Sequence, residues 1–240
     1  MAGAPELTIV VPARDEADNL PPLLAEIGEK LAGSRFEAIV VDDGSADSTP
    51  AVLASLAGRY PWLVVLRHDT PLGQSAALAS GFRAARGEAV ATLDADMQND
   101  PADLPAMWAL VRGGDADLVQ GIRASRRDSL SRIAAAAAAS AARRLVLGDR
   151  TRDIGCATRV MTAELARRLP LEFRGMHRFL PILARMRGAR IAEVPVSHRP
   201  RASGRSHYGI LGRGLSGFVD CLAVGWMLRR HRPPPPRPRP

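Results

Sequence analysis

The sequence predicts one α/β domain in which helices flank a mixed, mostly parallel sheet. Five short apolar runs alternate with segments of helical spacing between residues 7 and 121, a pattern typical of parallel sheets. The runs are nearly continuous, which indicates strands that are buried on both faces. With 46% hydrophobic residues in 240, the chain is long enough for a single domain with a full core.

The first half supplies the regular part of this pattern. "LTIVV" at 7–11 is β-rich and closed by Pro12, and residues 17–32 then carry leucines and isoleucine at helical spacing. Further strands are expected at 36–41, 62–66, 88–93 and 116–121, and further helices after Ser48-Thr49-Pro50, at about 74–85 and after Pro101.

The second half is less regular. Helices are expected at 129–147, 162–169 and 176–187, and strands at 153–161 and 189–200. We expect the domain to cover residues 1–209 and to be followed by an apolar, amphipathic helix at 210–230. The last ten residues, 231–240, are basic and proline-rich and are expected to be a disordered tail.

The charges are divided unevenly along the chain. Residues 1–120 hold 8 Lys and Arg against 18 Asp and Glu, whereas residues 121–240 hold 25 against 7. An acidic and a basic half suit a phosphate-rich substrate bridged to a metal, an anionic membrane or a nucleic acid. Aromatic residues make up only 4% of the chain, which counts against a stacking surface for single-stranded nucleic acid. Phosphates or a membrane are the favoured partners, and we expect no nucleic acid.

The cysteines and the N-terminus bear on the compartment. Cys156 and Cys221 lie far apart, with no C-x-x-C or Cys/His cluster, so neither a disulfide framework nor a structural zinc site is expected. The first apolar run ends at Pro12 after a few residues, which does not fit a secretion signal. We expect a reducing, cytoplasmic location.

Carboxylates follow the strand expected at 88–93. Asp94, Asp96 and Gln98 are spaced two residues apart, so in an extended chain their side chains would point the same way. Carboxylate and amide oxygens are ligands for Mg²⁺, which takes one or two carboxylates together with phosphates and water. The alternative is a polar turn, in which Asp100 caps the helix that starts at Pro101.

Two other expected strands also end in polar clusters. Asp42, Asp43, Gly44 and Ser45 could hydrogen-bond a ribose or base, although the same residues make a good turn. "VPARDEADNL" at 11–20 carries Arg14 and Glu16, or is an ordinary helix entry. Ligands of parallel sheets collect beyond the carboxyl ends of the strands. Three clusters at one edge therefore favour a crevice for a nucleotide and a metal.

Four segments together resemble the family 2 glycosyltransferases of the Rossmann-like GT-A fold. They are "VVPARDEADNL", "VVDDGSADST", "GQSAALASGFRAARGEAVATLDADMQNDP" and "RASGRSHYG", within a match from about residue 7 to 230. The chain resembles in particular the branch of dolichol-phosphate mannose synthase and undecaprenyl-phosphate glycosyltransferases. The resemblance implies inverting transfer of a sugar from a GDP- or UDP-sugar to a polyprenyl phosphate, with Mg²⁺ or Mn²⁺ on the diphosphate.

The resemblance also implies roles for single residues. Those expected to bind the donor nucleotide are Pro12, Arg14, Glu16, Asp42 and Asp43. Those expected to hold the metal are Asp94, Asp96 and Gln98, and the two aspartates then also contact the donor and take part in catalysis. Arg123 is expected to reach phosphate as a catalytic group and, with Arg132, to bind the acceptor phosphate.

A loop near the C-terminal helix is expected to close over the donor diphosphate. Arg201, Ser206 and His207 match the family's R-x-x-G-x-S-K pattern, with His207 in place of the usual Lys. A histidine loses its charge above roughly pH 6.5, so the departure weakens the expected clamp at higher pH.

Three questions stay open in the sequence. Asp153 is either an acceptor-side residue or a strand-entry aspartate paired with Arg152 or Arg159. The helix at 210–230 either lies on the membrane surface, at the cytoplasmic face, or packs on the domain. The acceptor could also be a soluble or polysaccharide hydroxyl, with Asp153 as the base, and a basic binding protein with a vestigial site is the alternative of another class.

Overall fold

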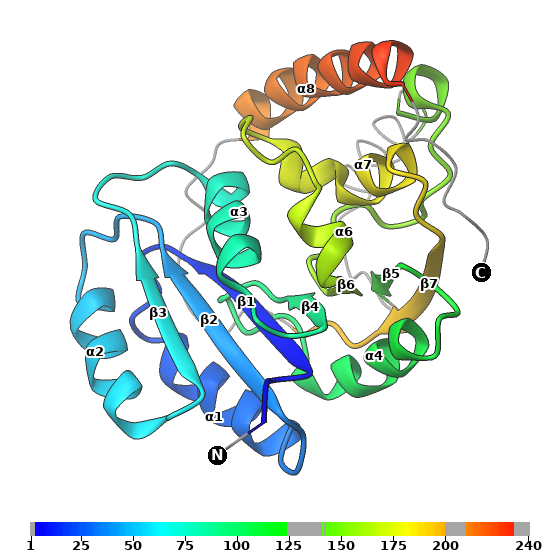
Figure 1. Ribbon diagram of the computed structural model, residues 1–240. Coiled ribbons are helices and arrows are strands. Elements are labelled where there is room, and N and C mark those ends of the chain that lie inside the picture. Colours follow the sequence, from blue (N-terminus) through cyan, green and yellow to red (C-terminus); the bar gives the residue numbers. More distant parts are fainter. Residues whose placement is uncertain (1–2, 124–140, 142, 200–209, 233–240) are drawn as a thin grey trace.

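The computed structural model describes residues 3–123, 141, 143–199 and 210–232 (Figure 1). In these residues seven strands form one sheet in the order β3-β2-β1-β4-β6-β5-β7. The strands are β1 (Leu7–Ala13), β2 (Phe36–Asp42), β3 (Leu63–Arg67), β4 (Ala89–Thr92), β5 (Leu118–Arg123), β6 (Arg159–Thr162) and β7 (Ile191–Val196). Only β6 runs antiparallel to its two neighbours, so the predicted mixed, mostly parallel sheet is confirmed.

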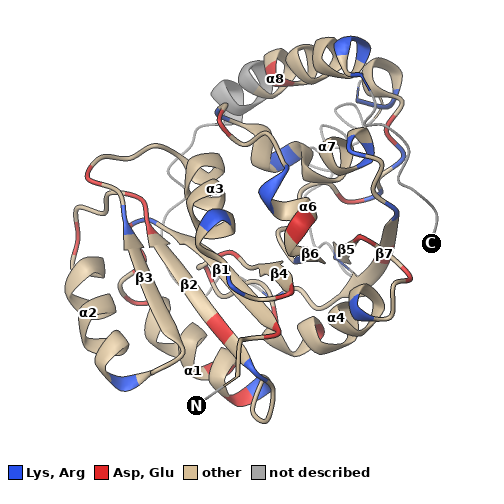
Figure 2. Ribbon diagram, in the orientation of Figure 1, with Lys and Arg blue, Asp and Glu red and all other residues tan. Residues whose placement is uncertain are grey.

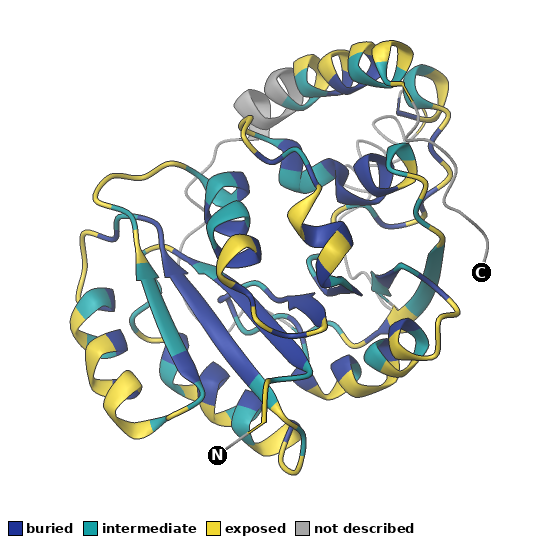
Figure 3. Cartoon of the chain, viewed as in Figure 1, coloured by how far each residue is buried: buried dark blue, intermediate teal, exposed yellow. Residues whose placement is uncertain are grey.

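Helices cover both faces of the sheet. They are α1 (Leu20–Lys30), α2 (Thr49–Arg59), α3 (Gln74–Ala84), α4 (Leu104–Arg112), α6 (Ala163–Arg167), α7 (Leu180–Met186) and α8 (Ile210–Arg230), with 3₁₀ turns η1 (Pro101–Asp103) and η2 (Met176–Phe179). One buried cluster joins the sheet to α1, α2 and α4, and a second joins it to α3, α6, α7 and α8. Figure 3 shows β1 and β2 buried along their length between these layers. The burial expected for the five strands is therefore confirmed for β1, β2, β4 and most of β5, whereas β3, at the edge of the sheet, is only partly buried.

The central strand β1 runs two residues beyond its predicted end. Pro12 lies opposite Val41 of β2, but the pairing of β1 with β4 stops at Val10 and Thr92. The Val10 carbonyl accepts from Leu93 N on the β4 side, so the nitrogen of Pro12, two residues on, faces the same side. Because the pairing of β1 with β4 has already ended at this point, the N–H that proline lacks is not needed for a hydrogen bond between strands.

The predicted strand at 153–161 is wrong in its first half, since β6 begins only at Arg159. The side-chain amide of Gln120 donates to the carbonyls of Asp153 (3.1 Å) and Cys156 (3.1 Å). These carbonyls are therefore bonded to a buried side chain instead of to a neighbouring strand, and 153–158 is a loop.

The C-terminal helix α8 covers the range expected for it. Cys221 and Val224 belong to the same buried cluster as α6 and α7. In Figure 1, α8 lies at the top of the view, and α6 and α7 lie between it and the sheet. No helix in the described part of the chain is long and apolar enough to cross a membrane. The tail expected at 231–240 lies outside the described residues from 233 onwards.

Candidate active site

Those predicted site residues that the structure describes gather where the parallel strands end. β1, β2, β4 and β5 end at Ala13, Asp42, Thr92 and Arg123, and the antiparallel β6 begins at Arg159. These ends lie at one edge of the sheet, which is where ligands bind in open α/β folds. Figure 2 shows basic residues along α6, α7 and the end of α8, on the side of the molecule formed by the second half of the chain.

The loops after β1 and β2 are bonded to each other. Asp15 N donates to Ser45 Oγ (2.9 Å), Ala46 N to Asp15 Oδ1 (2.8 Å) and Glu16 N to Thr49 Oγ1 (2.9 Å). Asp15 has a left-handed backbone, φ 54°, which turns the chain back toward the β2 loop. Two of the three polar clusters predicted from the sequence therefore form one surface.

The three residues predicted to bind the nucleotide from the β1 side lie on this surface in different environments. Pro12 is half-buried on β1, and Arg14 is exposed. Glu16 accepts a hydrogen bond from the side chain of Asn19 at 2.5 Å, so its carboxylate orients the start of α1. Their role toward a nucleotide stays a prediction.

Asp43 holds the loop that leads into α3. Its Oδ1 accepts from Leu72 N (2.9 Å) and contacts His68 Nδ1 (2.8 Å), and its Oδ2 accepts from Gly73 N (2.7 Å). Burial by itself would raise the pKa of this carboxyl, but the hydrogen bonds from His68, Leu72 and Gly73 outweigh it and lower the pKa. Asp43 therefore has a structural role, because it holds the loop before α3. Its predicted role in binding the nucleotide stays a prediction.

Asp42 is also buried. Its Oδ1 accepts from Ser45 N (3.0 Å), and Oδ2 faces Arg67 Nε at 3.5 Å without a hydrogen bond. Next to it, Gly44 has φ 68°, and a Cβ there would lie 2.7 Å from Pro71 N. Only glycine fits this close approach, so the β2 loop packs on the loop before α3.

The segment after β4 is a turn and not an extended strand. β4 ends at Thr92, residues 95–96 form a turn, and Met97 has φ 64°. The alternation that was expected to align Asp94, Asp96 and Gln98 is therefore wrong. A β-turn instead brings the two aspartates to one bend of the chain.

Each of these three side chains has a defined contact. Gln74 Nε2 donates to Asp94 Oδ1 (2.9 Å), and Gln98 N donates to Asp96 Oδ1 (3.2 Å). The side-chain nitrogen of Gln98, Nε2, lies 3.4 Å from the backbone carbonyl oxygen of Arg199. Asp94 is half-buried and Asp96 is buried, and each accepts a hydrogen bond from an amide N–H.

The turn offers two carboxylates, Asp94 and Asp96, as oxygen ligands for a hard divalent cation. Within the described residues, no three His, Cys, Asp or Glu side chains cluster closely enough to hold a metal ion. Mg²⁺ is commonly bound by one or two carboxylates, with phosphates and water completing its shell. Asp94 and Asp96 match that chemistry.

Arg123, predicted to bind phosphate, is bonded to Asp153. Its Nε donates to Asp153 Oδ2 (2.7 Å) and its Nη2 to Oδ1 (2.8 Å), and its backbone N also faces Oδ2 (3.2 Å). The two partners suggested from the sequence for Asp153 were wrong. Arg152 instead faces Glu193 (3.9 Å), and Arg159 donates to Gln120.

Arg159 is a buried cation at the start of β6, 4% exposed. It lies opposite Thr92 of β4 and Gln120 of β5, and it donates to Gln120 Oε1 (2.7 Å) and to the Ile154 carbonyl (3.0 Å). Burial lowers its pKa, whereas the negative charges of Asp94 and Asp153 favour the protonated form. A positive charge is therefore held behind the edge that carries Asp94 and Arg123.

The chain leading to the predicted donor loop passes directly beside the acidic turn. His198 forms an antiparallel bridge with Asn99, and Arg199 N donates to the Gln98 carbonyl (2.9 Å). Arg199 also binds Glu26 and Asp100 through its guanidinium. The predicted residues Arg132, Arg201, Ser206 and His207 lie outside the described residues, but Arg201 follows two positions after this anchor.

Three residues of this edge were not predicted. Gln74 stands in the quoted segment "GQSAALASGF", so its place after a strand could have drawn attention to it. Arg159 was considered only as a partner of Asp153. His177, in η2, contacts Ser75 beside Gln74, and nothing in the sequence near it points to a site. Both take their place from β6 and η2, which lie far from Asp94 along the chain.

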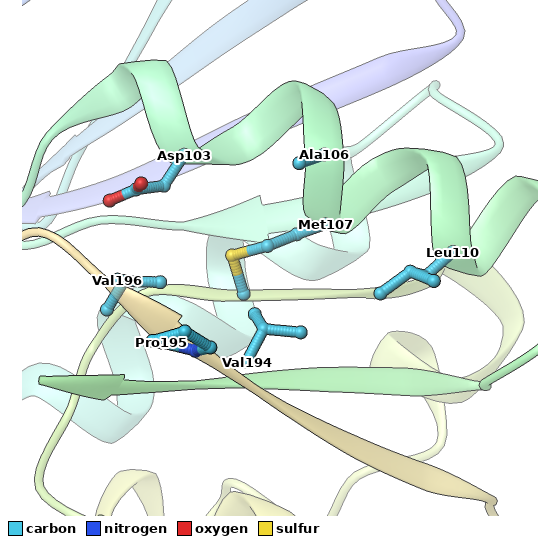
Figure 4. Close-up of a pocket in the computed structure, with 7 residues that line it drawn as sticks. All are labelled: Asp103, Ala106, Met107, Leu110, Val194, Pro195 and Val196. Atoms are coloured by element: carbon cyan, nitrogen blue, oxygen red, sulfur yellow. The ribbon is translucent and has the colours of Figure 1, made fainter. Parts of the chain in front are cut away.

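A small cavity of about 100 Å³ lies elsewhere, between α4 and β7 (Figure 4). It is lined mainly by apolar side chains, among them Met107, Leu110 and Val194. None of its lining residues belongs to the predicted site, so it plays no part in the reaction considered below.

The comparisons with known proteins agree with this geometry. The family model "Glycosyl transferase family 2" matches residues 8–173. The chain is 33% identical to the dodecaprenyl-phosphate galacturonate synthase of Rhizobium johnstonii, over 93% of this chain and 68% of that protein. It is 35% identical to the undecaprenyl-phosphate 4-deoxy-4-formamido-L-arabinose transferase of Pseudomonas savastanoi, over 84% of this chain and 60% of that protein.

Solved structures show the same fold at lower identity. The mannosyltransferase PcManGT of Pyrobaculum calidifontis, in complex with GDP-Man and Mn²⁺, has a TM-score of 0.69 at 20% identity, covering 97% of this chain and 67% of that one. Glucosyl-3-phosphoglycerate synthase of Mycobacterium tuberculosis, with Mg²⁺ and UDP, has a TM-score of 0.66 at 22% identity, covering 97% and 81%. From the family model and the curated relatives it follows that this chain belongs to glycosyl transferase family 2.

Proposed function

We propose that the protein is an inverting, metal-dependent glycosyltransferase that moves a sugar from a nucleotide sugar to a polyprenyl phosphate. Both curated relatives described above are named for a polyprenyl-phosphate sugar, and the present chain spans about two thirds of their length. The acidic turn at Asp94 and Asp96 supplies the ligands that a divalent ion on a diphosphate requires.

One structural observation carries the choice of acceptor. Asp153, the base candidate that the sequence offers, has both carboxylate oxygens bonded to Arg123. A hydroxyl acceptor must lose a proton to a base, whereas a phosphate monoester is already ionised at neutral pH and needs none. The pair therefore supports a phosphate acceptor over a hydroxyl acceptor.

The reaction is a single displacement at the anomeric carbon. An acceptor phosphate oxygen forms the new bond while the bond to the leaving nucleoside diphosphate breaks, so the configuration inverts. A divalent ion held by Asp94 and Asp96 would neutralise charge that develops on the leaving diphosphate. Arg123 presents a guanidinium oriented by Asp153, and Arg159 adds a buried positive charge behind it, where two anionic substrates must meet.

The decisive assay offers the purified protein a panel of UDP- and GDP-sugars with undecaprenyl phosphate and Mn²⁺, with lipid products identified by mass spectrometry. A polyprenyl-phosphate sugar is the expected product. Transfer only to soluble or polysaccharide hydroxyls would overturn the acceptor, and binding to membranes or nucleic acid without transfer of any sugar would overturn the activity.

We further propose that α8 lies on the cytoplasmic surface of the membrane. Its outward face carries exposed apolar side chains at helical spacing, with Trp226 65% exposed, and Arg229 and Arg230 follow at its end (Figure 3). The apolar residues of this face are Phe218, Val219, Leu222 and Trp226. Such a face enters the lipid interface while arginines bind anionic head groups.

The other side of α8 is fixed to the domain. Asp220 faces Arg178 Nη1 at 3.5 Å, and Gly175, at φ 83°, lies so close to Asp220 that a Cβ there would meet its carboxylate at 2.2 Å. The helix therefore holds the active domain in a set orientation to any surface that its outer face binds. Cys156 and Cys221 are both free and buried, in keeping with a reducing compartment.

Sedimentation with vesicles tests this placement. Leu222→Asp should weaken binding to vesicles that contain anionic lipid by about tenfold, and the fluorescence of Trp226 should shift to the blue on binding by the parent protein. Ala54→Asp, which adds the same charge to an exposed position of α2, should bind as the parent does. Equal binding of both variants would remove α8 from the membrane contact.

A further inference from the structure

Gln74 is the first residue of α3 and contacts the candidate metal ligand Asp94. Its Nε2 donates to Asp94 Oδ1 at 2.9 Å. A carboxylate on a short side chain can rotate about its last bond, and a hydrogen bond to one oxygen fixes the plane of the group. Side chains that orient metal ligands in this way commonly change metal affinity by 10- to 100-fold when they are replaced.

The start of α3 is itself held by η2. Ser75 Oγ contacts His177 Nδ1 (3.0 Å) and accepts a hydrogen bond from His177 N (3.1 Å). Ser75 is buried, so these two contacts fasten the first turn of α3, and with it Gln74, to a segment about a hundred residues further along the chain.

The ring of His177 is uncharged where it contacts Ser75. Ser75 Oγ accepts from the backbone N–H and can either donate its own hydrogen to Nδ1 or accept from an Nδ1–H through its second lone pair, so both neutral tautomers satisfy the contact. Burial, with the positive charges of Arg178 and Arg159, lowers the pKa of His177 to about 3. The ring is therefore neutral at physiological pH, and the contact with Ser75 does not change with pH in that range.

We infer that Gln74 and His177 are positioning residues for Asp94: Gln74 fixes the orientation of the carboxylate, and His177, through Ser75, fixes the position of Gln74. The inference rests on the proposed function, because it assigns the purpose of these contacts to the metal site. Neither residue is assigned a contact with substrate.

Replacement of Gln74 tests the first contact. Gln74→Met keeps the length and much of the volume of the side chain but removes the donor. We expect its dissociation constant for Mn²⁺ alone, measured by EPR of the free ion, to rise about tenfold. The kcat should fall while the KM for the nucleotide sugar changes less. Arg83→Ala, on the exposed side of the same helix, is the matched control and should bind Mn²⁺ as the parent does.

Replacement of His177 tests the second contact. His177→Leu removes the ring nitrogen that Ser75 Oγ contacts and should weaken Mn²⁺ binding in the same direction, by a smaller factor of roughly two to five, since the backbone bond to Ser75 persists. His177→Asn places a side-chain amide near the position of Nδ1, where its oxygen can accept from Ser75 Oγ or its nitrogen can donate to it, and should restore binding. A purely structural role would lower the melting temperature of His177→Leu without any change in Mn²⁺ affinity.

The outcomes separate this inference from the proposed function. If the parent protein binds Mn²⁺ and Gln74→Met binds it equally well, the inference is overturned and the proposed function stands. If the parent binds no Mn²⁺, both the proposed metal-dependent function and this inference are overturned. Should Gln74→Met not fold, Gln74→Asn, whose amide is shorter by one methylene, is held to the same tenfold expectation.

Discussion

The two sides of the active-site edge hold their charges in different ways. On the acidic side, formed by the loops after β1, β2 and β4, Asp43 accepts from two backbone N–H groups and contacts His68, and Asp94 accepts from the amide of Gln74. On the basic side, formed by the end of β5 and the start of β6, Arg123 is paired with Asp153 and Arg159 donates to neutral acceptors.

This difference shows what each side can offer a ligand. A carboxylate that accepts hydrogen bonds from amide N–H groups can still bind a cation, whereas an arginine oriented by a carboxylate presents its remaining N–H groups in a set direction. The split between an acidic first half and a basic second half of the sequence is therefore found again at the site. It suits a metal-bound diphosphate on one side and an anionic acceptor on the other.

Neutralising the acidic side should have the largest effect. Asp96→Asn keeps an oxygen that can accept from Gln98 N but removes the charge, so we expect kcat/KM to fall by about 100-fold or more. The melting temperature should stay within a few degrees of the parent's. Transfer assays over a range of Mn²⁺ concentrations, with differential scanning fluorimetry, measure both.

The matched control for this change is Asp115→Asn, an exposed aspartate before β5, which removes one negative charge away from the site. It should leave transfer unaltered. If Asp96→Asn turns over normally at saturating Mn²⁺, Asp96 is not a metal ligand, and the acidic side loses its assigned role.

On the basic side, removal of the buried cation should affect the free energy of unfolding first. Arg159→Met leaves Gln120 Oε1 and the Ile154 carbonyl without their donor, and an unpaired buried polar group costs about 1–3 kcal/mol. We expect a loss of about 2–4 kcal/mol in urea unfolding. Arg159→Lys, which keeps the charge, should lose less of the affinity for UDP or GDP than Arg159→Met does. Equal nucleotide affinity of the two variants would make Arg159 a purely structural residue.

The sequence predicts the acidic side better than the basic side, for a physical reason. Asp42, Asp43, Asp94 and Asp96 each follow a strand within a few residues, so local hydrophobic pattern and strand ends are enough to place them at one edge. What the pattern misses there is local backbone geometry: the turn at 95–96 and the positive φ of Met97 replace the expected alternation.

The basic side depends on pairings between distant segments. Arg123 meets Asp153, Arg159 meets Gln120, and Ser75 meets His177, a separation of 102 positions. An antiparallel insertion such as β6 has no signature in a chain that otherwise alternates strand and helix. The family resemblance could therefore name Arg123, and the sequence could name Asp153 as either a site residue or a paired aspartate, but neither could pair the two.

A double-mutant cycle sharpens the comparison at Arg123 and Asp153. The pair is bidentate and mostly buried, so we expect a coupling energy of about 1–2 kcal/mol in urea unfolding of Arg123→Ala, Asp153→Asn and the double variant. In kinetics, Arg123→Ala should raise the KM for the acceptor, and Asp153→Asn should do so by a smaller factor. A loss of kcat of about 100-fold or more for Asp153→Asn, at normal acceptor KM, would instead identify Asp153 as a base.

The smallest effect on the free energy of unfolding is expected at Asp43. Its negative charge can be removed in two ways, by replacement with Asn or by protonation at low pH. Because the folded pKa of this carboxyl lies below its ordinary value of 3.8, its contribution to stability is complete above that value and is lost as the pH falls through the folded pKa. Asp43→Asn should lower the free energy of unfolding by about 1–2 kcal/mol at pH 7, since the bonds from Leu72 and Gly73 lose their charged acceptor. The difference between parent and variant should narrow as the pH falls below about 3.8 in urea titrations, while Asp69→Asn, an exposed neighbour, shows no such trend. A constant difference over that pH range would mean that the loop before α3 is held by shape alone, and that the acidic side does not depend on the charge of Asp43.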